Sequence, residues 1–182
     1  RGTNGPQVIE TCKATHPLYK AFLTAGAQAG YAFTPDQNGK HHEGFHVAQA
    51  FTHGGKRCST SRAYLRPVMG RANLTVMTRT LTHKVRFEGS RAVGIIAERQ
   101  GETVELNAER EVILCGGTIS TPQLLLLSGV GDTAHLSEHD IATTAHVPAV
   151  GRNLENHQIV PISYATPSGV SMSHKFRGLG KY

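Results

Sequence analysis

The residues of this sequence that could hold a metal ion stand in a histidine-rich segment. His42, Glu43 and His46 satisfy the H-E-x-x-H pattern, in which two histidines bind zinc and the glutamate acts as a base. That chemistry needs a helix, so that both imidazoles project from one face. Because Gly44 interrupts the motif, we predict a loop and no metal site. Adventitious metal binding by His41, His42 and His46, and a metal-dependent hydrolase at His42 and His46, remain as alternatives.

Two glycine patterns could bind phosphate, and neither stands in the context that phosphate binding needs. Residues 129–134 match G-x-G-x-x-A, but they follow an expected helix, whereas a dinucleotide fingerprint follows a strand and opens a helix. We interpret Gly129 as the end of that helix, in the left-handed conformation that glycine adopts at low cost. Residues 54–57 are not a P-loop, because Arg57 replaces the hydroxyl residue that holds magnesium.

A third segment combines a strand, two glycines and a helix. Residues 111–115 form a short apolar run without alternation, which is typical of a strand buried on both faces of a parallel sheet. Two glycines follow at 116–117. Thr121 is expected as the N-cap and Pro122 as the first residue of the next helix. This order of elements indicates an α/β fold.

The elements expected elsewhere surround this segment. A helix is predicted over 16–30, a strand over 45–51 and a short helix over 59–65 that stops before Pro67. Strand patterns separated by turn residues predict an antiparallel meander, with strands at 74–78, 84–87, 92–97 and 103–106. The fold class is therefore α/β in the helix-bearing segment and α+β overall.

Composition excludes several classes of protein. The 182 residues suit one domain or slightly more, and no apolar run approaches the length of a membrane span. The net charge of +6 comes from scattered basic residues, which argues against nucleic-acid binding. Cys12, Cys58 and Cys115 form no C-x-x-C pair, so we expect a reducing, cytoplasmic location, with peripheral membrane association left open.

Residues 117–131 resemble the second signature of the glucose–methanol–choline (GMC) flavoprotein oxidoreductases. The matching positions include Gly117, Thr121, Pro122, Ser128, Gly129 and Gly131. Residues 151–157 are similar to the family's G-x-N-L-x-D-H stretch through Asn153 and His157, with Asn156 in place of the usual Asp. Residues 2–6, 59–65, 73–76 and 91–94 also resemble family segments. The resemblance covers nearly the whole chain and is closest to choline dehydrogenase-like members.

The resemblance implies FAD as the cofactor and the oxidation of a small-molecule alcohol by hydride transfer to the flavin. Thr82 matches the residue whose backbone contacts the FAD adenine, although it also fits a plain meander position. Cys115, Gly116 and Gly117 match a strand end near the cofactor, although they also fit a tight turn. The remaining signature residues are expected to be structural, with His157 also able to lie near the cofactor: Thr121, Pro122, Ser128, Gly129, Gly131, Asn153 and His157.

The resemblance also implies that the chain is an internal part of a longer enzyme. Residues 1–57 would belong to an antiparallel-sheet substrate domain, 58–157 to a Rossmann-like FAD domain, and 158–182 would return to the substrate domain. The family's G-x-G-x-x-G finger would precede Arg1 and its catalytic histidine would follow Tyr182. We therefore expect no catalytic residue in this chain, no activity by itself, and exposed apolar faces that could drive self-association. The alternative is a non-catalytic cofactor-binding or interaction module derived from this fold.

Overall fold

The computed structural model describes residues 2, 4–13, 15–164 and 170. The described residues divide into two compact units, one made of those up to Thr75 and from Ile162 onward, the other of Val76–Pro161. Most of residues 158–182, assigned above to a return into a substrate domain, lie outside the described part of the chain. Within that part, no helix combines the length and the apolar character needed to cross a bilayer.

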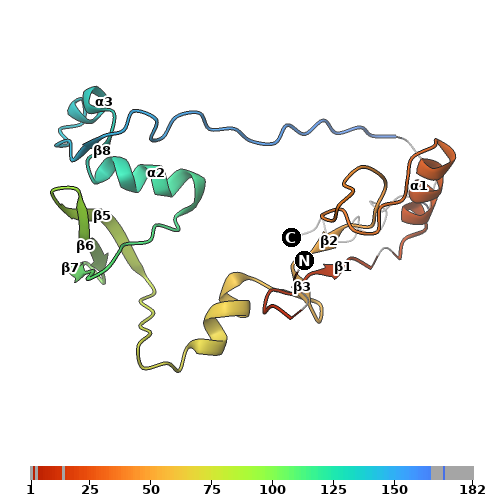
Figure 1. The fold of residues 1–182 in the computed structure, drawn as a ribbon, viewed down its shortest axis with the longest axis horizontal. Helices are drawn as coiled ribbons and strands as arrows, with labels where there is room; N and C mark the ends of the chain where they lie inside the picture. Colours follow the sequence, from red (N-terminus) through yellow and green to blue (C-terminus); the bar gives the residue numbers. More distant parts are fainter. Residues whose placement is uncertain (1, 3, 14, 165–169, 171–182) are drawn as a thin grey trace, which may run out of the picture. The chain divides into compact units, whose positions relative to one another are not determined.

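The first unit contains helix α1 (Pro17–Gln28), which confirms the helix expected over 16–30 (Figure 1). Pro17 opens the helix, and the His16 side chain accepts a hydrogen bond from the Leu18 N–H at 3.3 Å. Gly26 is buried on this helix, and a Cβ there would lie 2.6 Å from the Phe45 ring. Glycine therefore lets Phe45 pack directly on the helix backbone.

The strands of the first unit are short. They form two antiparallel pairs: β1 (Glu10–Thr11) with β2 (Gln49–Ala50), and β3 (Thr52–His53) with β4 (Lys56–Arg57). The strand expected over 45–51 is therefore wrong except at its end. Phe45 makes only an isolated bridge to Phe33, and its ring contacts those of Phe22 and Tyr31 at centroid distances of 5.0 and 5.5 Å.

The short helix expected over 59–65 exists in altered form. It is a π-helical turn at Ser61–Leu65 that continues into a 3₁₀ turn at Arg66–Val68. The π-helical turn ends at Leu65, before Pro67 as expected, but helical backbone continues through Pro67 in the separate 3₁₀ turn. Pro67 occupies the first turn of the 3₁₀ segment, where a backbone N–H has no helical partner, so the absence of one in proline costs no hydrogen bond.

The second unit is built on the expected meander (Figure 1). Its strands β5 (Thr80–Glu88), β6 (Arg91–Arg99) and β7 (Glu102–Asn107) pair antiparallel in that order. Gly89 and Gly101 take positive φ angles of 59° and 83° in the two turns, as glycine does readily. The meander is confirmed, but residues 74–78 form no strand and precede β5 as irregular chain.

Residues 111–115 do not form the buried strand that was expected. They are extended but pair with no strand of the described residues, and the Ile113 side chain is 72% exposed. A parallel strand needs neighbours to satisfy its backbone groups and cover its side chains, and the described residues bring none to the segment. The one parallel pair of strands in the described part joins β8 (Val130–Gly131) to β9 (Ala145–His146).

Helix α2 (Gly117–Leu127) begins earlier than its sequence predicts. Gly116 is the N-cap, so Thr121 and Pro122 lie inside the helix rather than at its start, and that expectation is wrong. The first turn is exposed, and water can satisfy its free N–H groups without a capping side chain. The predicted end is confirmed, since Ser128 is the C-cap and Gly129 follows with φ +82°.

Candidate functional site

Ser128 joins the end of α2 to the edge strand of the meander through hydrogen bonds. Its Oγ accepts a hydrogen bond from the backbone N–H of Val85 on β5 at 2.8 Å and donates to the Leu124 carbonyl at 2.5 Å. Ser128 and Val85 are both buried. Because β5 is an edge strand, this hydroxyl supplies the partner that a further strand would otherwise provide.

Two glycines of the same signature allow close approach of the chain around this anchor. Gly129 has a positive φ, and a Cβ there would lie 2.7 Å from Thr144 Oγ1 and against the Ala142 carbonyl oxygen. A Cβ at Gly131 would lie 2.5 Å from Leu126 Cδ2. Both positions are buried, and at Gly129 the conformation favours glycine as well as the packing, whereas at Gly131 only the packing does. The structural roles expected for Ser128, Gly129 and Gly131 stay predictions that these contacts make testable by substitution.

A cavity of about 380 Å³ lies where this helix meets the meander and the extended segment before it. Its walls come from β5, β6, residues 112–116 and α2: Leu81, Thr82, Ile95, Val112, Ile113, Leu114, Cys115, Gly116, Ser120, Gln123, Leu124 and Leu127. Three of the four residues expected near the cofactor, Thr82, Cys115 and Gly116, therefore share one cavity. Gly117 follows Gly116 in the chain but does not line the cavity.

The cavity wall is suited to binding a molecule rather than to acting as an acid or base. It is largely apolar, with polar atoms from Thr82, Ser120 and Gln123 and the thiol of Cys115. It contains no carboxylate, lysine, arginine or histidine. Such a wall suits a flat apolar group with few hydrogen-bonding atoms, because apolar contact supplies affinity and the polar atoms set orientation.

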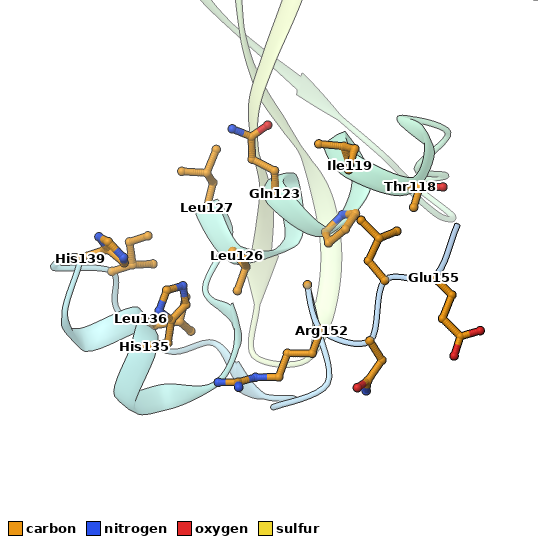
Figure 2. A pocket seen from close by; sticks show the side chains of 15 residues that line it. Thr118, Ile119, Gln123, Leu126, Leu127, His135, Leu136, His139, Arg152 and Glu155 are labelled. Atoms are coloured by element: carbon orange, nitrogen blue, oxygen red, sulfur yellow. The ribbon is translucent and has the colours of Figure 1, made fainter. Parts of the chain in front are cut away.

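A second, larger groove of about 830 Å³ adjoins the neighbouring face of α2 (Figure 2). Gln123 and Leu127 belong to both walls. Asn153, expected as a structural signature residue, lines this groove and has φ +57°. Gly131 is packed under Leu126, which also lines it. Sequence reasoning did not identify this groove, because its walls are far apart along the chain.

Neither the cavity nor the groove includes His157 or the histidines of the loop at 41–46. His157 is exposed, and its backbone N–H bonds to the Asn156 side chain at 2.8 Å. His42 and His46 lie in a loop in which Gly44 has φ +129°, which confirms the loop prediction. Among the residues described, His42, Glu43 and His46 do not gather closely enough to hold a metal ion.

Comparison with known proteins shows the family to which this fold belongs. The family model described as GMC oxidoreductase matches residues 5–159. The mitochondrial choline dehydrogenase of Mus musculus is 44% identical over 181 residues, covering 100% of this chain and 30% of that protein. The oxygen-dependent choline dehydrogenase of Staphylococcus saprophyticus is 45% identical over 172 residues, or 94% of this chain and 30% of that protein.

A solved structure agrees with these sequence relatives. The crystal structure of pyridoxine 4-oxidase from Mesorbium loti has a TM-score of 0.76 and 27% sequence identity over 81% of this chain and 29% of that one. The chain belongs to the FAD-dependent GMC oxidoreductase family and is choline dehydrogenase-like. It spans about 30% of the length of the choline dehydrogenases it matches, which is consistent with a fragment.

Proposed function

We propose that this chain is a segment of an FAD-dependent enzyme that oxidises a small alcohol, choline or a choline-like molecule, and that it forms part of the FAD site. The observation that carries the proposal is the cavity shared by Thr82, Cys115 and Gly116. Those residues were assigned to the cofactor from family resemblance alone, and they come from segments more than thirty residues apart. The identity to choline dehydrogenases over the whole chain supports the choice of substrate class.

The residues present fit one end of FAD, the adenine. The cavity is largely apolar, and one of its walls is the edge strand β5, on which the Val85 N–H is bonded to Ser128. Gly117, which does not line the cavity, has φ +80° and open space where a Cβ would stand, so in this proposal it borders the site without forming its wall. The cavity wall supplies no cationic side chain for a pyrophosphate.

In this proposal the chain contributes binding and orientation. When bound, FAD accepts the hydride removed from the alcohol carbon. Thr82 lies on the cavity wall and would lie beside the adenine, and Leu124 and Leu127 of α2 would exclude water from one side of it. The wall has no charged side chain, so we place the group that takes the alcohol proton elsewhere in the enzyme. The 182 residues alone are then inactive.

The domain assignment and the partners follow from the same proposal. Residues 1–57 and 158–182 would serve the substrate domain and 58–157 the Rossmann-like FAD domain. The exposed apolar side chains Leu81, Ile113 and Ile119, each more than 60% exposed, would be covered by other parts of the enzyme or by self-association. A cytoplasmic location stays a prediction, because the relatives include a mitochondrial protein as well as bacterial ones.

The test is to fill the cavity in the enzyme that carries this segment. Cys115→Trp adds a large side chain to the wall, and we expect at least tenfold less bound flavin per protein, read from visible absorbance after desalting. The matched control is Cys12→Trp at another exposed cysteine, which should retain flavin. Full flavin content in Cys115→Trp would refute the cavity assignment. Absence of flavin from the unsubstituted enzyme would instead favour the non-catalytic module.

A further inference from the structure

Three potential metal ligands gather at the end of helix α3 (Thr133–Ser137). His135 Nδ1 lies 3.7 Å from Glu138 Oε2, and the His135 and His139 rings meet edge to face with centroids 4.9 Å apart. One ligand atom from each of the three residues lies within 4.8 Å of the others. No other group of this kind occurs in the described part of the chain.

The spacing of these residues explains why they converge. Positions i, i+3 and i+4 stand on one face of a helix, so the three side chains leave the backbone in the same direction. The turn that carries Glu138 and His139 is held by backbone hydrogen bonds to Ala134 and Leu136, both at 3.1 Å. Leu136 is 1% exposed and anchors this element to the unit. The ligands therefore stand on a supported backbone.

The donor set indicates which ion would bind. Two imidazole nitrogens and one carboxylate oxygen suit a borderline transition ion such as Zn²⁺, whereas Mg²⁺ and Ca²⁺ prefer oxygen ligands alone. Bonds of about 2.0–2.2 Å require the ligand atoms to move slightly closer together. The side chains of His135 and Glu138 are 45% and 72% exposed, so small rotations achieve this without moving the backbone.

The groove described above begins beside these ligands. His135 and His139 both line its wall, and Figure 2 shows their rings together at one end. Arg152, a cationic side chain on the groove wall, lies 3.5 Å from Asp132 Oδ2, so a carboxylate stands beside it. Three protein ligands leave a fourth coordination position of a tetrahedral ion free for water or another donor.

We propose that His135, Glu138 and His139 bind one divalent transition-metal ion of the Zn²⁺ class at the end of the groove. The alternative is a surface ion pair between His135 and Glu138 with no ligand, which contributes little to stability. The sequence carries a signal for this site in the H-x-x-E-H spacing of residues 135–139, which the prediction of no metal site from His42 and His46 did not include. This proposal does not depend on the assignment of the FAD site.

The experiment consists of two titrations of the full 182-residue chain. Zn²⁺ binding is measured by calorimetry, and Co²⁺ binding is measured by the visible absorption of the bound cobalt. We expect saturation at one ion per chain and no heat with Mg²⁺. His139→Ala and Glu138→Gln should each weaken Zn²⁺ binding at least tenfold and change the cobalt spectrum. Circular dichroism should be unchanged, because both side chains are exposed.

The matched control removes the other histidine cluster. A variant with His41→Ala, His42→Ala and His46→Ala should retain the one-ion saturation and the cobalt spectrum. Loss of binding in this control, with retention in His139→Ala, would overturn the proposal and place the metal in the histidine-rich loop. An absence of saturable Zn²⁺ binding by the unsubstituted chain would also overturn it.

Discussion

Replacing Ser128 by alanine tests whether the signature serine fastens α2 to the meander. The substitution removes the acceptor of the Val85 N–H, which is bonded at 2.8 Å. Because this donor is buried, water does not replace the lost partner. A buried polar group deprived of its partner costs about 1–3 kcal/mol. The second bond, from Ser128 Oγ to the Leu124 carbonyl, adds little, because that carbonyl also accepts from the Ser128 N–H at 3.1 Å.

The expected loss is therefore about 2 kcal/mol in the free energy of unfolding. With an m-value of about 1–3 kcal/mol/M in urea, the midpoint should fall by roughly 1 M. The measurement is urea unfolding of the 182-residue chain, followed by far-UV circular dichroism. Ser120→Ala on the exposed face of the same helix is the control and should change stability by less than about 0.5 kcal/mol. Equal midpoints for the two variants would refute the anchoring role.

Two further predictions concern conformation and charge. Gly129→Ala should destabilise the chain by more than Gly101→Ala, although their φ angles are nearly equal at +82° and +83°. The left-handed conformation costs both variants about 1–2 kcal/mol, and only Gly129 also has neighbouring atoms where a Cβ would stand; equal losses in urea unfolding would contradict this. The hydroxyl of Thr52, bonded to Glu10 at 2.8 Å, and the Gly54 N–H lower the pKa of the Glu10 carboxyl below its ordinary 4.5. Any stabilisation from this pair is therefore present at neutral pH and is lost as the pH falls through the folded-state pKa. An NMR titration should show the Glu10 pKa rising in Thr52→Val, and an unchanged value would contradict the assignment.

Local signals in the sequence predicted the parts of the fold that local interactions decide. The meander follows from turn glycines such as Gly89 and Gly101 between strand patterns, and the end of α2 follows from Gly129. The start of α2 was missed because Pro122 is a common first helical residue, yet here exposed glycines begin the helix five residues earlier. Residues 111–115 were expected as a buried strand, but their apolar character implies partners that the described chain does not contain.

The candidate site also has residues that the sequence could indicate and contacts that it could not. Resemblance alone indicated Thr82, Cys115 and Gly116, and the structure places them on one cavity wall, although no spacing rule connects them. The bond between Ser128 and Val85, 43 positions apart, could not be predicted, because nothing in either segment identifies its partner.

That bond gives the signature a physical purpose. Ser128 holds α2 against β5, while Gly129 and Gly131 let the chain turn closely beneath it. Leu124 and Leu127 of the same helix form part of the cavity wall. If the proposed FAD site is right, the signature residues need not touch the cofactor to affect its binding, because they position the helix that would enclose it. On this reasoning Ser128→Ala should weaken flavin binding through the cavity's shape, whereas Cys115→Trp should do so by occupying the space itself.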